Sequence, residues 1–149
     1  MLAAPEIYAF LDEPGPLPLD QLYERYRKLE TRRSSDGTQQ WLNWVIRLEA
    51  TGQCAGFVQA TVHPDATAGF AYVLAPAFWG RGIAHAACVA AIELLRGVYG
   101  VRALYATADA RNARSINLLL RLGFAPLDRR AYPHGEVAEG DRAFAKQLR

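Results

Sequence analysis

The chain has 149 residues, of which 51% are hydrophobic and 21% charged, and its net charge is +2. This is the size and composition of one ordinary globular domain, which we expect to span residues 1–149 with a core of its own. So small a positive excess does not favour a nucleic-acid partner. No apolar run approaches the ~20 residues that cross a bilayer, and the first ten residues lack the pattern of a secretion signal. Cys54 and Cys88 fit neither a metal motif nor a disulfide framework, so we expect a cytoplasmic protein with no metal and no membrane partner.

The first half of the chain predicts one helix followed by three strands. Residues 19–33 space their apolar side chains as an amphipathic helix does. Residues 41–50 alternate between apolar and polar side chains, which is typical of a half-buried strand. A short turn leads to a second strand over residues 54–62, and another turn leads to a third over residues 69–75. Strands joined by such short turns predict an antiparallel meander.

The second half predicts helices and strands in alternation. Residues 84–98 form an alanine-rich helix that is apolar on all sides and should be largely buried. A fourth strand over residues 101–109 follows this crossover and should run parallel to the third. A second amphipathic helix should begin after an N-cap at Asn112 and end at a left-handed Gly123. Two weaker strands lie within residues 124–133 and 140–148, so the predicted fold is α/β with a mixed sheet.

The connection between the third strand and the alanine-rich helix carries an unusual glycine pattern. Gly80 and Gly82 flank Arg81 immediately before the helix begins. The first N–H groups of a helix have no intrahelical partners and the helix dipole is positive there, so this position suits an anion such as a diphosphate. Neither the nucleotide-binding G-x-x-x-x-G-K-[ST] motif nor G-x-G-x-x-G is present. On the loop alone, a tight turn with incidental glycines remains an equal alternative.

Two motifs together resemble the GNAT acetyltransferase superfamily, and more closely its branch of ribosomal-protein and aminoglycoside-type N-acetyltransferases. The run Trp79-Gly80-Arg81-Gly82-Ile83-Ala84 is similar to the family loop Q/R-x-x-G-x-G/A, in which this branch often has tryptophan first. Asn112 and Ser115, with Leu122-Gly123-Phe124 after them, resemble the second signature, Asn-x-x-Ser followed by Leu-Gly-Phe. The resemblance covers about residue 19 to the C-terminus.

The resemblance implies a mostly antiparallel sheet flanked by helices and an enzyme that transfers acetyl from acetyl-CoA to a primary amine. The backbone amides from Arg81 to Ala84 would bind the pyrophosphate, and the third strand near Val73 and Leu74 would pair with the pantetheine amides. Asn112 and Ser115 would contact the pantetheine arm or the thiol, although an N-cap and a first-turn serine explain them equally well. The N–H of Val73 or Leu74 would stabilise the negative charge on the reacting oxygen.

The acid and base that many family members carry are absent at three positions. Gly69 and Ala86 stand where glutamates are common, and Leu119 stands where a tyrosine often acts as the general acid. Ser115 is then the nearest hydroxyl that could act as the acid. The base candidates are Glu49, His63, His85 and Glu136.

The missing strong base predicts the kind of acceptor. A lysine amine with pKa 10.4 is only about 0.1% neutral near pH 7.5, whereas about a quarter to a third of an α-amine is neutral there. A protein N-terminus or a small-molecule amine of low pKa is therefore the expected acceptor.

The beginning of the chain departs from the family pattern as well. Family members usually have a further strand and helix before the segment PEIYAF, Pro5 to Phe10. Either the start lies upstream, or the fold lacks its usual first strand. A start placed too late would leave a domain that binds CoA poorly or that pairs with another chain as a homodimer. Two other functions stay open: a CoA-binding or interaction module without efficient turnover, and modification of an aminoglycoside, which would need an acidic acceptor pocket.

Overall fold

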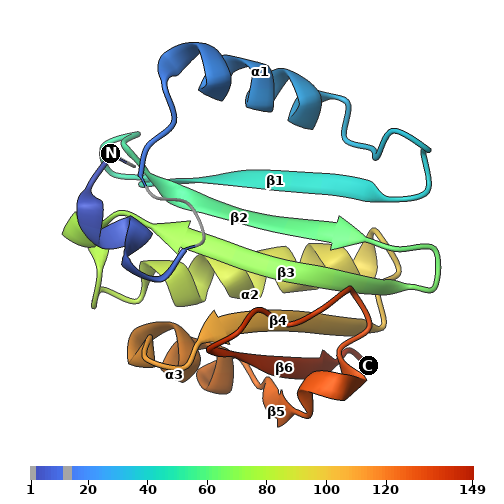
Figure 1. Ribbon diagram of the computed structural model, residues 1–149. Helices are drawn as coiled ribbons and strands as arrows, with labels where there is room; N and C mark the ends of the chain where they lie inside the picture. Colours follow the sequence, from blue (N-terminus) through green and yellow to red (C-terminus); the bar gives the residue numbers. More distant parts are fainter. Residues whose placement is uncertain (1–2, 12–14) are drawn as a thin grey trace.

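A computed structural model describes residues 3–11 and 15–149, and its centre is one six-stranded mixed sheet (Figure 1). The order across the sheet is β1-β2-β3-β4-β6-β5. All neighbouring strands are antiparallel except β3 and β4, which are parallel. The strands are β1 (Gln40–Arg47), β2 (Cys54–Val62), β3 (Thr67–Leu74), β4 (Ala103–Asp109), β5 (Ala125–Leu127) and β6 (Asp141–Gln147). The predicted meander and the parallel fourth strand are confirmed, as is the mixed, mostly antiparallel sheet flanked by helices.

The helices are α1 (Leu19–Glu30), α2 (Ile83–Gly97) and α3 (Ala113–Arg121), with short 3₁₀ turns η1 (Pro5–Phe10), η2 (Pro76–Phe78) and η3 (Arg129–Ala131). The N-cap prediction is confirmed, because the side chain of Asn112 accepts a hydrogen bond from the N–H of Ser115. Gly123 has a φ of +89°, as expected of a residue that ends a helix in the left-handed conformation. Residues 12–14, in the proline-containing segment before α1, lie outside the described residues.

One face of the sheet holds the core. Even-numbered strand residues such as Leu42, Val58 and Leu104 are buried together with the inner faces of α2 and α3. Phe144 in β6 is fully buried at the centre of this core. Because side chains alternate along a strand, the odd-numbered residues lie on the opposite face, where Val45 is 62% exposed.

The predicted burial of the alanine-rich helix was too extensive. Helix α2 buries only the stripe Cys88, Ala91, Ile92 and Leu95, while Val89 and Leu94 are exposed, so it is covered on one side rather than on all sides. Helix α1 forms as predicted but has no buried residue, and Leu19 at its start is 82% exposed. In Figure 1, α1 lies beyond the β1 edge of the sheet. No helix within residues 3–11 and 15–149 is long and apolar enough to cross a membrane.

Candidate acetyl-CoA site

Strands β3 and β4 separate soon after they meet. They pair at only three positions, and the last pair joins Gly69 to Tyr105, which we call the branch point. Beyond it, β3 stays paired with β2 as far as Leu74, so residues 70–74 have a neighbouring strand on one side only. We call these residues the β3 edge. Their backbone groups on the β4 side can bind an extended ligand as a further strand would.

Hydrogen bonds at both ends of the β2–β3 pair show which backbone groups of β3 point away from β2, toward the open side of the β3 edge. The N–H of His63 donates to the carbonyl of Thr67, and the N–H of Ala75 donates to the carbonyl of Ala55. Since these groups alternate along an antiparallel pair, the N–H of Val73 points toward β2 and the N–H of Leu74 points away from it. Of the two candidate donors, only Leu74 therefore faces the open side.

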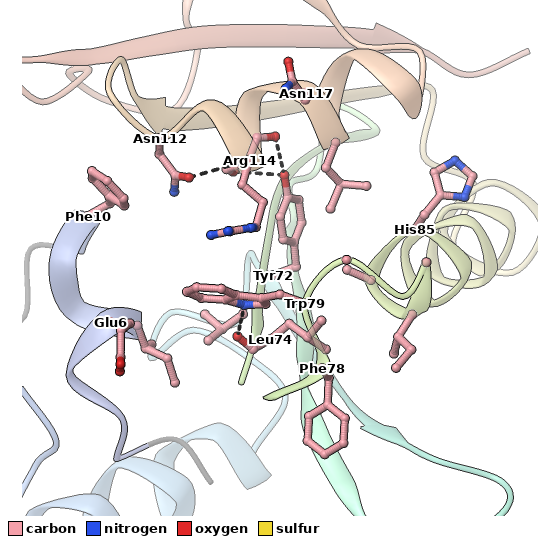
Figure 2. A pocket seen from close by; sticks show the side chains of 18 of the residues that line it. Glu6, Phe10, Tyr72, Leu74, Phe78, Trp79, His85, Asn112, Arg114 and Asn117 are labelled. Atoms are coloured by element: carbon pink, nitrogen blue, oxygen red, sulfur yellow. Dashed lines mark hydrogen bonds between the residues drawn. The ribbon is translucent and has the colours of Figure 1, made fainter. Parts of the chain in front are cut away.

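The side chain of Trp79 fixes the end of the β3 edge. Its indole N–H donates to the carbonyl of Leu74 at 2.8 Å, so this carbonyl is already bound within the protein. The guanidinium of Arg114, from α3, lies over the Trp79 ring at 3.9 Å from its centroid. Figure 2 shows the indole and Arg114 side by side in the cavity. Trp79 thus connects β3, the loop and α3.

The loop after β3 turns through two left-handed glycines. Gly80 and Gly82 have φ values of +70° and +75°, a conformation that side chains other than glycine rarely adopt. Gly82 is also the N-cap residue of α2 and offers no side-chain cap. The first N–H groups of this 15-residue helix are therefore left to a ligand or to water.

A cavity of about 500 Å³ connects the β3 edge, the loop and α3 (Figure 2). Part of its wall comes from η1, which Figure 1 shows at the same end of the sheet as the start of α2. The described residues that line it are Glu6, Ile7, Phe10, Leu11, Tyr72, Val73, Leu74, Phe78, Trp79, Gly80, Gly82, Ile83, Ala84, His85, Asn112, Arg114, Ser115, Asn117, Leu118 and Arg121.

Most of the predicted site residues meet in this cavity. Nine of the ten predicted cofactor residues line it, and the tenth, Arg81, does not: its guanidinium lies 5.7 Å from the centroid of Phe78. Glu49 is exposed in the turn between β1 and β2 and is not among the lining residues. Of the other base candidates, only His85 contributes to the wall.

The sequence analysis missed Tyr72, Arg114 and Arg121. The two arginines lie seven residues apart on α3, a spacing that places both on one helix face, so the helical period could have found them. Tyr72 gave no such signal, because its neighbours across the site come from a distant helix.

Tyr72 and Ser115 form a polar pair beside the β3 edge. The Tyr72 hydroxyl donates to the carbonyl of Ser115 at 3.0 Å and lies 3.0 Å from the Ser115 hydroxyl. With its own proton given to the carbonyl, the phenol oxygen accepts from the serine, and Figure 2 shows the phenol reaching α3. Burial raises the pKa of Tyr72 above its ordinary value, so the phenol stays protonated at physiological pH. The pair can donate a proton but is a poor base.

Replacing Tyr72 with phenylalanine tests this pair. We expect the free energy of unfolding to fall by about 1 kcal/mol, because the hydroxyl pair is lost, and turnover to fall because the Ser115 hydroxyl loses its orienting partner. Denaturant unfolding and a thiol-release assay measure both. Tyr99→Phe, which changes a tyrosine after the end of α2, is the control. Unchanged stability and turnover in Tyr72→Phe would show that the hydroxyl pair contributes neither to folding nor to the reaction.

The buried cysteine is not a nucleophile. Burial raises the pKa of the Cys88 thiol to about 12, so almost no thiolate exists at neutral pH, and the thiolate is the reactive form. The side chain lies inside the core, where its exposed fraction is 0%. Acyl transfer through Cys88 is therefore excluded.

The family comparison agrees with this geometry. Residues 1–125 match the family model described as Acetyltransferase (GNAT) domain. The chain belongs to the GNAT acetyltransferase family. No curated protein matches it in sequence.

Several solved structures share the fold at low sequence identity. A spermidine N-acetyltransferase from Vibrio cholerae in complex with CoA and spermine is 17% identical to this chain and has a TM-score of 0.77. The comparison covers 97% of this chain and 84% of the other. A GNAT acetyltransferase from Bacillus anthracis is 15% identical, with coverages of 98% and 84% and a TM-score of 0.77. A domain from Methanocaldococcus jannaschii is 19% identical, with coverages of 99% and 87% and a TM-score of 0.75.

Proposed function

We propose that the protein is an N-acetyltransferase that moves acetyl directly from acetyl-CoA to a primary amine. The observation that carries the proposal is the continuity of the cavity from the N-terminus of α2 to the β3 edge. The helix end offers N–H groups to the phosphates, and the strand edge offers backbone groups to the amide-containing arm. Acetyl-CoA supplies an activated acyl group as a thioester, and the residues of the cavity fit its alternation of charged and amide segments.

Different residues of the cavity bind the cofactor, stabilise negative charge and donate the proton. The first amides of α2 bind phosphate, and the guanidinium groups of Arg114 and Arg121 add the positive charge that the side chain of Arg81 does not bring to the wall. The N–H of Leu74 faces the open side, where it can stabilise negative charge on the reacting oxygen. Ser115, hydrogen-bonded to Tyr72, holds the proton for the departing sulfur.

Changing Gly82 to alanine tests the loop. The left-handed φ of +75° costs a residue with a side chain about 1–2 kcal/mol, so the loop should rearrange and the dissociation constant of acetyl-CoA should rise about tenfold. Titration calorimetry measures it. Gly37→Ala is the matched control, because Gly37 has a φ of +74° but precedes β1 and does not line the cavity. Equal CoA affinity in the two variants would contradict the assignment of the loop.

We further propose that the acceptor is an amine with a substantial neutral fraction, such as a protein N-terminus or a small-molecule amine of low pKa. Deprotonation of a lysine-type amine near pH 7.5 costs about 4 kcal/mol. The only carboxylate among the described lining residues is Glu6, whereas Arg114 and Arg121 make the wall positive. This charge balance suits CoA and disfavours a polycation, although spermidine N-acetyltransferases share the fold.

A panel of acceptors tests this choice. Matched peptides with a free or a blocked α-amine, each containing one lysine, are compared with spermidine by thiol release. We expect the free α-amine to react fastest at pH 7.5. Faster reaction of lysine or spermidine would overturn the acceptor assignment while leaving acetyl transfer intact.

A further inference from the structure

A cluster of histidines and tyrosines lies outside the cavity, beside the branch point. The rings of His63 and His134 stack with their centroids 3.9 Å apart. Tyr105 meets His134 edge-on at 5.4 Å, and Tyr132 does so at 5.8 Å. Tyr105 is itself one of the two branch-point residues. Elements far apart in the sequence therefore converge on the imidazole of His134.

A relay of hydrogen bonds fixes the tautomer of His134. The Thr67 hydroxyl donates to a carboxylate oxygen of Asp65 at 2.6 Å, and the pKa of Asp65 is lowered chiefly by this bond, so the carboxylate is ionised and accepts. The same hydroxyl lies 2.9 Å from Nε2 of His134. Because the proton of the hydroxyl is already given to Asp65, Nε2 must be the donor. Burial lowers the pKa of His134 below its ordinary value, so the ring is neutral near pH 7, with its proton on Nε2 and a lone pair on Nδ1.

The lone pair of Nδ1 faces Gly69. Nδ1 is buried and has no hydrogen-bond partner among the described residues. A Cβ at Gly69 would lie 3.7 Å from Nδ1 and would meet no other atom within 4 Å, so the absent side chain leaves that position to a donor. A buried acceptor without a donor is costly, and a bound N–H group or a single water would satisfy it.

The branch point gives this lone pair a role in the proposed reaction. The cavity reaches Tyr72, three residues and therefore about 10 Å along the strand from Gly69. Because side chains alternate along a strand, positions 69 and 72 face opposite sides of the sheet. His134 lies on the side of position 69, so it is on the face opposite to the pair Tyr72–Ser115. Direct transfer has two proton transfers, one from the amine and one to the sulfur, and a separate base and acid can serve them.

We infer that His134 is the general base, whose Nδ1 takes the proton of the acceptor amine through a short chain of water molecules, while Thr67 and Asp65 are positioning residues. The inference rests on the proposed function. The amine nitrogen forms its bond to the acetyl carbon, and the C–S bond breaks with its electron pair on sulfur. The proton that leaves the amine passes to Nδ1, and the Ser115 hydroxyl gives its proton to the sulfur. Solvent then takes the proton from Nδ1 and returns one to Ser115. The products are an amide and a thiol.

The surroundings of His134 also limit what it can deprotonate. Burial lowers the pKa of His134 below its ordinary value; the neighbouring His63 lowers it further, and Asp65 opposes this. The other titratable groups that face the ring are Tyr105 and Tyr132. Such a base accepts a proton from an amine that is already attacking, but it cannot strip a lysine-type ammonium group beforehand. The cluster therefore favours the acceptor class proposed above.

The test compares His134→Gln with the wild type. Glutamine can keep the hydrogen bond to Thr67 but has no basic nitrogen. We expect kcat/KM for an α-amine peptide to fall about 100-fold or more, with acetyl-CoA affinity unchanged. In the wild type kcat/KM should fall as the pH drops through the lowered pKa of His134, and His134→Gln should lose this limb. Glu139→Gln, an exposed position in the same loop, is the control and should retain wild-type activity.

Two further measurements separate the possible failures. Long-range ¹H–¹⁵N spectra of the wild type without any ligand should show His134 with its proton on Nε2; a proton on Nδ1 would overturn the inference without reference to activity. Imidazole added to His134→Gly should restore part of the rate. If the wild type is active and His134→Gln keeps both its rate and its pH profile, His134 is not the base. If the wild type transfers acetyl to no amine, it is the proposed function that fails.

Discussion

Replacing Gly56 with alanine should both destabilise the fold and abolish tight binding of acetyl-CoA. Gly56 lies opposite Leu74, and a Cβ there would collide with the carbonyl oxygen of Val73 and lie 2.9 Å from the Cα of Leu74. Both neighbours are backbone atoms, so β3 itself must move. We expect the free energy of unfolding to fall by about 3 kcal/mol, at the upper end of the usual cost of overpacking.

The displacement acts on the part of β3 that the ligand should use. A shift at Leu74 moves the N–H of Leu74. It also disturbs the hydrogen bond that the Leu74 carbonyl accepts from the Trp79 indole. Denaturant unfolding measures the stability, and calorimetry at a temperature where the variant is folded measures binding. Gly97→Ala, at the end of α2 with no atom within 4 Å of its Cβ, is the control and should be nearly neutral. A Gly56→Ala protein with wild-type stability and affinity would contradict the close approach of β2 and β3.

Removing Arg114 and Arg121 together should weaken acetyl-CoA binding about 100-fold or more. Both line the cavity, and hydrogen bonds to charged groups contribute about 1.5–3 kcal/mol each. Unlike Gly56→Ala, the double alanine variant should keep its fold, because both side chains are exposed.

The control removes the same amount of charge elsewhere. Arg27 and Arg33 lie on and just after α1 and do not line the cavity, so Arg27→Ala with Arg33→Ala should leave affinity nearly unchanged. Calorimetry at two salt concentrations distinguishes a direct contact from long-range attraction, which salt screens. Equal losses in the two double variants would show that net charge, and no specific arginine, attracts the ligand.

The elements and their order could be predicted because each carried a local signal. The alternation in β1, the cap at Asn112 and the left-handed Gly123 are properties of short segments, and the structure reproduces them. Burial was less predictable. Helix α2 is apolar all round, and only packing against the sheet decides which side is covered.

The candidate site was predictable where it is made of one continuous segment. Residues 79–84 form such a segment, and five of these six residues line the cavity. His134 could not be found in this way, since its significance depends on Gly69 and Thr67, which are more than sixty residues earlier. Glu49 was a candidate by residue type alone, and the turn in which it lies keeps it out of the cavity wall.

The most direct test of the account is to incubate the wild type with acetyl-CoA and a peptide bearing a free α-amine. Released thiol and the mass of the peptide are then measured together. We expect one acetylated α-amine for each thiol released, at a rate far above hydrolysis without the peptide. Tight binding of CoA with no thiol release beyond that hydrolysis would contradict it, and would identify the protein as a CoA-binding module.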